Sequence, residues 1–171
     1  MEISSENPES PAVEVKTPFR WGALTDIGRV RQENQDAWLV NPELGLFIVT
    51  DGMGGHRGGA QAAGIVIEDL PVMIETGLHR LKHKNRRTLR RVIEKSLIEH
   101  SRHVRLEGSA ERGRVDMGAT VVVLLLQGGR GFIGSLGDSR IYRLRRGRLG
   151  QLTHDHSVAV SYTHLRAHET K

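Results

Sequence analysis

Cysteine is absent from all 171 residues of the sequence. Disulfide bonds, thiolate zinc sites and a cysteine nucleophile are therefore excluded. A chain without cysteine is compatible with a reducing compartment, and we expect a cytoplasmic protein. Long apolar runs are also lacking, because the longest, residues 119–126, is too short to cross a bilayer as a helix. The first residues lack the basic and apolar regions of a secretory signal, so we expect no membrane segment.

Aromatic residues make up only 4% of the chain, and this scarcity affects how its net charge of +5 is interpreted. The basic residues concentrate in residues 80–105 and 140–148. No aromatic residue interleaves with the first cluster to stack on bases, so we predict no nucleic-acid partner. The cations there instead indicate the solvated face of an amphipathic helix. Its predicted buried stripe consists of Leu89, Val92, Ile93, Leu97 and Val104.

The length of the chain is suited to one domain with a hydrophobic core. Residues 1–18 are polar and rich in proline, which predicts a disordered N-terminal lead. Residues 161–171 have no apolar period and resemble translated adaptor sequence, so we interpret them as a non-native tail. The predicted domain therefore occupies residues 19–160.

The order of predicted elements indicates the fold class. Helices are predicted at residues 60–70, where Pro71 should kink or end the helix, and at residues 86–106. A polar loop should follow at residues 107–117, and the β-branched run at 119–126 suits a strand buried on both faces. Strands before and after a block of helices favour an α+β domain with a mainly antiparallel sheet. Residues 37–40 and 46–50 are predicted to form a hairpin. The other predicted strands are residues 19–24, 131–136, 140–144 and 149–152.

Three acidic clusters lie beside glycines or at predicted strand ends, in residues 31–36, 51–56 and 134–140. Carboxylates followed by a glycine, whose backbone carbonyl can approach closely, suit hard cations. Manganese or magnesium therefore fits better than zinc. Each cluster alone is also a common turn sequence, and only their joint occurrence favours a metal site.

Five segments, in the order and spacing found here, resemble bacterial 2C-type protein phosphatases, which are metal-dependent serine/threonine phosphatases of the PPM type. The resemblance covers the N-terminal portion of that family. It implies an α+β fold with a β-sandwich flanked by helix pairs, in α-β-β-α layers. The matching segments are residues 28–31 with 34–36, 49–56, 117–120, 137–142 and 152–157.

The resemblance also implies roles for individual residues. Asp51 would bridge two divalent ions, Mn²⁺ or Mg²⁺, and the Gly52 carbonyl would bind one of them. Asp36 would orient metal-bound water, and Asp138 would serve a weaker third metal site. Arg31 would hold the substrate phosphate, for which its planar, permanently charged fork is well suited.

The implied activity is hydrolysis of phosphoserine or phosphothreonine in proteins by water that two metal ions activate. The implied partners are a phosphoprotein substrate and the serine/threonine kinase that acts opposite to the phosphatase. An alternative is a non-catalytic module that binds phosphoprotein or metal and keeps the same residues. Metal stoichiometry and turnover separate the two hypotheses.

The sequence departs from the family pattern at several positions. Gln35 stands where the family usually has Glu, which should weaken metal binding, while Met53 is common in bacterial members. His56 could be a proton donor or one of several surface histidines. Residues 155–157 are interpreted as a structural turn rather than as catalytic.

The family pattern is expected to stop after Val160, so we expect a C-terminally truncated domain. The family continues with two further aspartates that complete the first metal site, and we find neither in this sequence. We therefore expect little or no activity from residues 1–171 alone. A sheet shortened in this way should also expose apolar surface.

Overall fold

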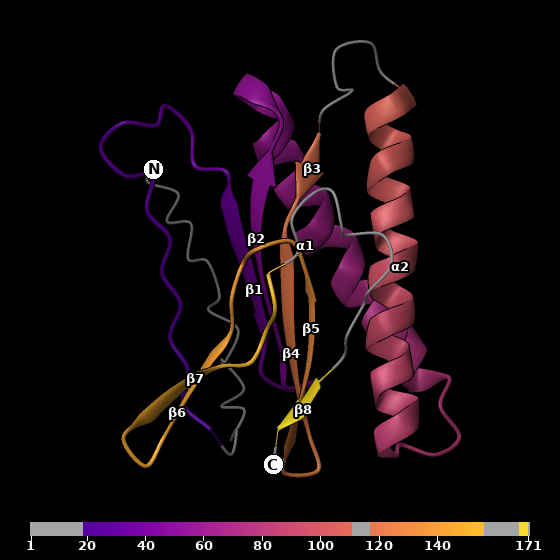
Figure 1. The fold of residues 1–171 in the computed structure, drawn as a ribbon. Coiled ribbons are helices and arrows are strands. Elements are labelled where there is room, and N and C mark those ends of the chain that lie inside the picture. The colour runs from indigo at the N-terminus through magenta and orange to yellow at the C-terminus, as the bar shows by residue number, and fades with distance from the viewer. Residues whose placement is uncertain (1–18, 111–116, 156–167, 171) are drawn as a thin grey trace, which may run out of the picture.

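The computed structural model describes residues 19–110, 117–155 and 168–170, without the side chains of residues 55–57, 107–110 and 168–170. The predicted N-terminal lead and most of the predicted tail lie outside these residues. One antiparallel sheet forms the centre of the molecule, with strand order β1-β2-β4-β5-β8, and β3 pairs with β2 (Figure 1). A separate antiparallel pair consists of β6 and β7. The strands are β1 (Asp36–Asn41), β2 (Leu46–Met53), β3 (Gly118–Ala119), β4 (Val121–Gln127), β5 (Arg130–Leu136), β6 (Tyr142–Arg145), β7 (Arg148–Gln151) and β8 (His168–Thr170).

The predicted hairpin is confirmed as β1 and β2. Its turn is closed by a hydrogen bond of 3.3 Å from the Gly45 backbone N–H to the Pro42 carbonyl and by one of 3.0 Å from the Leu44 N–H to the Asn41 side chain. Gly45 has a φ of 68°, a conformation that favours glycine. The register that follows pairs Asn41 with Leu46 at the turn and Asp36 with Asp51 at the open end.

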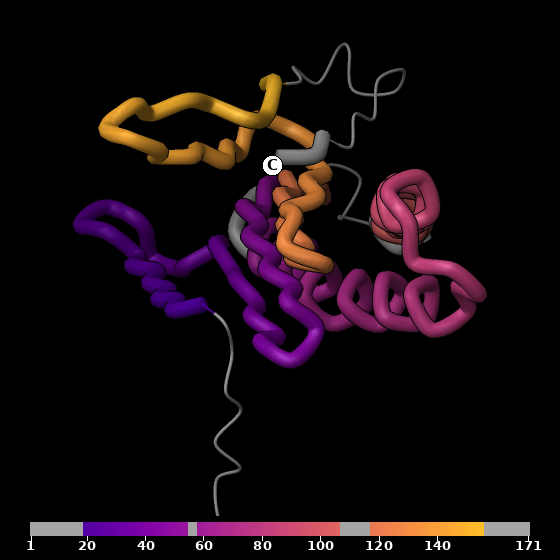
Figure 2. Tube along the Cα trace, turned by 90° about the horizontal axis from the view of Figure 1, so that it is seen from below, coloured from indigo at the N-terminus to yellow at the C-terminus, as the bar shows by residue number. Residues whose placement is uncertain are grey.

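Two helices, α1 (Gly55–His79) and α2 (Arg86–Ala110), lie on the same side of the sheet (Figure 2). Alternate residues of β2 face them, since Leu46, Ile48 and Thr50 are buried while their neighbours are less so. The hydrophobic core therefore lies between the helix pair and the sheet. All five apolar residues of the predicted α2 stripe are buried, as expected.

The start of α2 is fixed by a reciprocal cap. The Asn85 side chain accepts a hydrogen bond from the Thr88 backbone N–H, and the Thr88 hydroxyl lies 3.0 Å from the Asn85 backbone N–H. The helix then continues to Ala110, so the predicted loop at residues 107–117 is wrong for its first four residues. Residues 111–116 lie outside the described part of the chain.

The sequence predicted that Pro71 would kink or end the first helix. Pro71 does not end it, because α1 continues to His79. Proline removes one backbone hydrogen bond from a helix interior. The side chains on either side of it offset this loss, since Leu70, Ile74 and Leu78 are at most 1% exposed in the core. Tertiary burial therefore overrides the local preference.

The predicted strand at residues 19–24 is also wrong, because this segment has no regular secondary structure. A strand needs a neighbouring strand to satisfy its backbone groups, and the segment joins no described sheet. Its apolar side chains remain largely in solvent, with Trp21 47% and Leu24 92% exposed. Residues 19–35 and the β6–β7 hairpin project from the sheet on the side away from the helices (Figure 2).

The sheet face opposite the helices is apolar and partly open. Trp38 and Val49 are paired across β1 and β2 and are 38% and 49% exposed. The predicted strand at 119–126 corresponds to β3 and β4, and Val121, Val122 and Val123 are buried on both faces as expected. Beyond the predicted domain, β8 pairs with β5, and its assignment to a non-native tail stays a prediction. Neither described helix is long and apolar enough to span a membrane.

Candidate metal centre

The acidic residues meet at the open end of the β1–β2 hairpin. Asp36 and Asp51 are direct partners in the antiparallel register, so their side chains leave the sheet on the same face. They lie on the wall of a cavity of about 660 Å³, whose other walls come from the loop before β1 and from the end of β2 up to Gly54, just before α1. Residues 26–27, 30–36 and 51–54 line this cavity. The structure therefore places Arg31, Asp36, Asp51 and Gly52 around one cavity, and the roles assigned to them stay predictions.

The electrostatics of the centre are dominated by the two opposed carboxyls. Partial burial raises the pKa of Asp51, and the charge of Asp36 and a hydrogen bond with its side chain raise it further. The charge of Asp138 acts in the same direction, whereas that of Arg31 lowers the pKa. Asp36 therefore opposes the ionisation of Asp51, and a cation bound between them would favour the ionised form of Asp51.

Arg31 is held beside the carboxylates by a loop with its own local bonds. The Gly28 backbone N–H donates to the Asp26 side chain at 2.7 Å, and Gly28 has a φ of 74°. At the end of the loop, the Asn34 side chain donates to the Thr25 hydroxyl at 2.9 Å and accepts from the Asp36 N–H at 3.0 Å. These bonds fix the backbone on both sides of Arg31 and join the loop to the first residue of β1.

Gly52 lies where β2 and α1 approach most closely. A Cβ at this position would lie 1.9 Å from the Gly59 carbonyl oxygen, so no larger residue fits without a backbone shift. The Gly52 N–H donates to the Gln35 carbonyl at 3.0 Å, which ties the loop to β2. A Cβ on Gly59 would in turn lie 2.7 Å from the Gly52 carbonyl oxygen. The two glycines thus allow the N-terminal end of α1 to pack directly behind Asp51.

Thr120 is the positioning residue that the sequence analysis missed. Its hydroxyl accepts a hydrogen bond from the Asp51 backbone N–H at 3.1 Å and lies 2.6 Å from the Ser139 hydroxyl. Its backbone N–H donates to the Asp51 carbonyl at 2.8 Å, and its carbonyl accepts from the buried Thr50 hydroxyl at 2.7 Å. One residue therefore joins Asp51 to the loop that carries Asp138. Its place at the end of a matched family segment was the only sequence signal for it.

Asp138 lies in that loop, between Gly137 and Ser139. Gly137 has a φ of 90°, and a Cβ there would lie 2.8 Å from the Thr120 side chain, so the loop crosses close to β4. Asp138 acts on Asp51 through its charge, but Asp36, Asp51 and Asp138 do not bring three carboxylate oxygens within 4.8 Å of one another. The centre is therefore a close pair of carboxylates with a more distant third.

This donor set fits the hard divalent cation that the family implies. Carboxylate and carbonyl oxygens are the ligands that Mg²⁺ and Mn²⁺ prefer, whereas zinc favours sulfur and nitrogen. The close approach of Asp36 and Asp51 gives a further reason, since a divalent charge would offset their repulsion. Gln35 lines the same cavity with a neutral side chain.

The remaining predicted residues have different outcomes. Asp155 accepts hydrogen bonds from Arg140 and from Gln151, in agreement with a structural rather than a catalytic role. His156 and Ser157, predicted to share that role, lie outside the described residues. The His56 side chain also lies outside the described part of the structure, so its role as a proton donor stays a prediction.

Replacement of Thr120 by valine is expected to destabilise the protein by about 1–3 kcal/mol, because the Asp51 N–H loses its partner. Mn²⁺ affinity should fall as well, since Asp51 is less firmly held. Urea unfolding and Mn²⁺ titration measure the two effects. Thr120→Ser keeps the hydroxyl and serves as the control. A Thr120→Val variant as stable as the wild type, or a larger loss in Thr120→Ser than in Thr120→Val, would show that the methyl group, and not the hydrogen bond, is what matters.

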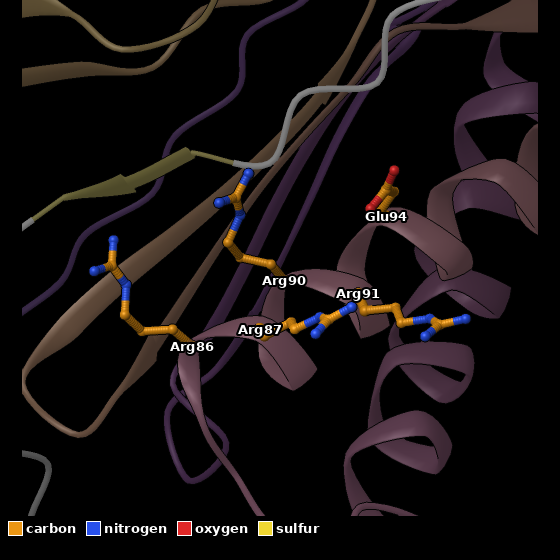
Figure 3. A pocket seen from close by; sticks show the side chains of 5 residues that line it. All are labelled: Arg86, Arg87, Arg90, Arg91 and Glu94. Carbon is orange, nitrogen blue, oxygen red and sulfur yellow. The ribbon is translucent and has the colours of Figure 1, made fainter.

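A second cavity, of about 450 Å³, lies at the start of α2 and is lined by arginines. Figure 3 shows that Arg86 and Arg90 extend to one side while Arg87 and Arg91 extend to the other, with Glu94 one turn further along. The guanidinium groups therefore do not converge on one point. All five residues are exposed, which is typical of the solvated face that the sequence predicted for this helix.

Comparison with known proteins gives the family of the chain. Residues 28–169 match the family model described as protein phosphatase 2C, a match that extends past Val160. Serine/threonine phosphatase stp of Listeria welshimeri is 33% identical over 137 residues, which cover 78% of this chain and 53% of that protein. Protein phosphatase PhpP of Streptococcus pneumoniae is 34% identical over 142 residues, which cover 79% of this chain and 54% of that protein.

A solved structure shares the fold. The catalytic domain of serine threonine protein phosphatase PstP in complex with two manganese ions superposes with a TM-score of 0.59 at 29% identity, covering 82% of this chain and 57% of that chain. The chain spans about half the length of the curated relatives that it matches. The α+β class is confirmed, and the described residues supply one helix pair and the sheet beneath it. Because the family match covers most of the chain and the acidic centre lies within it, the chain belongs to the protein phosphatase 2C family.

Proposed function

We propose that this chain supplies the metal-binding and phosphate-binding part of a protein serine/threonine phosphatase. The observation that carries the proposal is the placement of Arg31 on the wall of the cavity that also holds the opposed carboxyls of Asp36 and Asp51. Opposite charges in one cavity suit a phosphate monoester together with divalent cations. Family membership and the manganese ions of the solved relative support the same reaction class.

Each residue would have a distinct part in the reaction. Asp51, shared between two ions, and the Gly52 carbonyl would hold Mn²⁺ or Mg²⁺, and Asp138 would serve a weaker third site. The ions, when bound, would activate water and neutralise the phosphoryl oxygens. Asp36 would orient the attacking water as a hydrogen-bond acceptor. Arg31 would bind the phosphate through two parallel N–H groups of its planar guanidinium.

The substrate would be phosphoserine or phosphothreonine in a protein, and a serine/threonine kinase would act opposite to the phosphatase. The names of the relatives support this class of substrate. The residues that the proposal places at the ions are three carboxylates, Asp36, Asp51 and Asp138, and the Gly52 carbonyl, fewer protein ligands than two well-held ions usually have. We therefore propose weak metal binding and slow turnover for these 171 residues.

The test combines Mn²⁺ titration with hydrolysis of para-nitrophenyl phosphate. Two bound ions together with slow hydrolysis that disappears in Asp51→Asn would support the phosphatase. One weakly bound ion without hydrolysis would favour the alternative, a non-catalytic module. Mn²⁺ binding that does not involve Asp51 would contradict both.

Replacement of Arg31 by alanine is expected to weaken binding of inorganic phosphate about tenfold in the presence of Mn²⁺, because a charge-assisted pair of hydrogen bonds is lost. Isothermal titration calorimetry measures the dissociation constant. Arg29→Ala is the matched control, since it removes the same charge from the same loop at a position that does not line the cavity. Equal weakening in the two variants would mean that Arg31 acts only through general charge.

A further inference from the structure

The interface between α1 and α2 contains a buried histidine without a hydrogen-bond partner. His100 is 1% exposed and continues the apolar stripe of α2 that includes Leu97 and Val104. Neither of its ring nitrogens has a partner among the residues that the structure describes. A buried polar ring is unfavourable unless something satisfies it, so His100 points to an additional ligand.

Two further donors converge on His100. His103 follows it by three positions and therefore lies on the same face of α2. Asp69 faces both from the adjacent helix α1, and its carboxylate lies 3.0 Å from the His103 Nδ1. One donor atom from each of Asp69, His100 and His103 lies within 4.8 Å of the other two. Such a cluster of two imidazoles and one carboxylate can surround a single ion.

We propose that Asp69, His100 and His103 form a transition-metal site, of the class that binds Zn²⁺, which joins α1 to α2. Imidazole nitrogens with a carboxylate are typical ligands of zinc and its neighbours and unlike the oxygen ligands of Mg²⁺ or Mn²⁺. Three protein ligands leave a fourth position for water. The ion would give one nitrogen of His100 its missing partner.

The surroundings allow such an ion to enter and bind. The side chains of His103 and Asp69 are 49% and 37% exposed, so the site opens to solvent on one side. Burial lowers the pKa of His100, so its ring keeps a lone pair for a metal near neutral pH. None of the three residues lines the cavity of the acidic centre, so the two sites are separate.

The test uses Co²⁺ as a spectroscopic probe, because Co²⁺ bound to nitrogen ligands absorbs visible light, and Zn²⁺ as the competitor. The full chain is expected to show the visible absorption of one nitrogen-bound Co²⁺, which Zn²⁺ removes. The affinity measured by this absorption should fall tenfold or more in His103→Ala and in Asp69→Asn. It should be unchanged in His83→Ala, which removes an exposed histidine beyond the cluster. Affinity equal to wild type in His103→Ala and Asp69→Asn would overturn the proposal.

A stability measurement tests the buried ligand. His100→Leu replaces the ring with an apolar side chain in an apolar stripe, so the variant should fold without metal. Zn²⁺ should raise the melting temperature of the wild type and leave that of His100→Leu unchanged. An equal response of both proteins to Zn²⁺ would mean that the ion binds elsewhere, and that the His103–Asp69 pair is a simple ion pair beside an unsatisfied histidine.

Discussion

Asp51→Asn is expected to weaken Mn²⁺ binding by about 100-fold or more and to abolish any manganese-dependent hydrolysis. The substitution keeps the shape of the side chain but removes its charge and the second carboxylate oxygen with which it would bridge two ions. Asp51 is also the residue on which the surrounding contacts converge, through Thr120, Asp36 and Asp138. Electron paramagnetic resonance of free Mn²⁺ during a titration gives the affinity directly.

The matched control lies in the same hairpin. Glu43→Gln also removes one carboxylate charge, but from the turn, at the end of the hairpin opposite to Asp36 and Asp51. It should leave Mn²⁺ affinity unchanged within about twofold, because charges separated by more than a Debye length are largely screened. A similar loss in both variants would mean that Mn²⁺ responds to overall charge and not to this site.

Asp51→Asn is also expected to affect stability, and in the absence of metal this effect is not a loss. Two like charges directly opposed across antiparallel strands are destabilising, so removing one should leave the free energy of unfolding unchanged or increase it. Reduced Mn²⁺ binding together with undiminished stability is the combination expected for a functional carboxylate. Reduced stability in metal-free buffer would instead assign Asp51 a structural role.

Local sequence patterns predicted most of the secondary structure, because those elements depend on neighbouring residues. The hairpin follows from its turn: once residues 42–45 form the turn, the antiparallel register places Asp36 opposite Asp51. The apolar stripe of α2 follows from its period. The opposed pair of Asp36 and Asp51 in the candidate site could therefore be predicted from residues 31–52 alone.

The features that were missed depend on contacts between distant segments. Pro71 remains inside α1 because the core buries the residues around it, and residues 19–24 form no strand because no described strand pairs with them. Thr120 supports Asp51 because β3, which precedes Thr120, pairs with β2. In the sequence, both helices lie between these two strands. His100 and Asp69 meet only because α1 and α2 pack antiparallel. No local pattern contains this information.

Gly52→Ala is expected to destabilise the protein by about 3 kcal/mol or more, at the upper end of the cost of overpacking. The new Cβ would lie 1.9 Å from the Gly59 carbonyl oxygen and 2.4 Å from its carbonyl carbon, both of them backbone atoms. A flexible side chain could rotate away, but here either β2 or the first turns of α1 must move. Urea unfolding monitored by circular dichroism measures the loss.

The control for this prediction is Gly64→Ala in α1, where an added Cβ meets nothing within 4 Å. It should stabilise the protein by about 0.5–1 kcal/mol, because alanine is the better helix former. Opposite signs for the two substitutions would locate the cost of Gly52→Ala in the contact between β2 and α1 rather than in the loss of a glycine. A neutral Gly52→Ala would show that α1 can retreat from β2 without cost. The Gly52 carbonyl would then be loosely held, and a metal role for it would lose its structural basis.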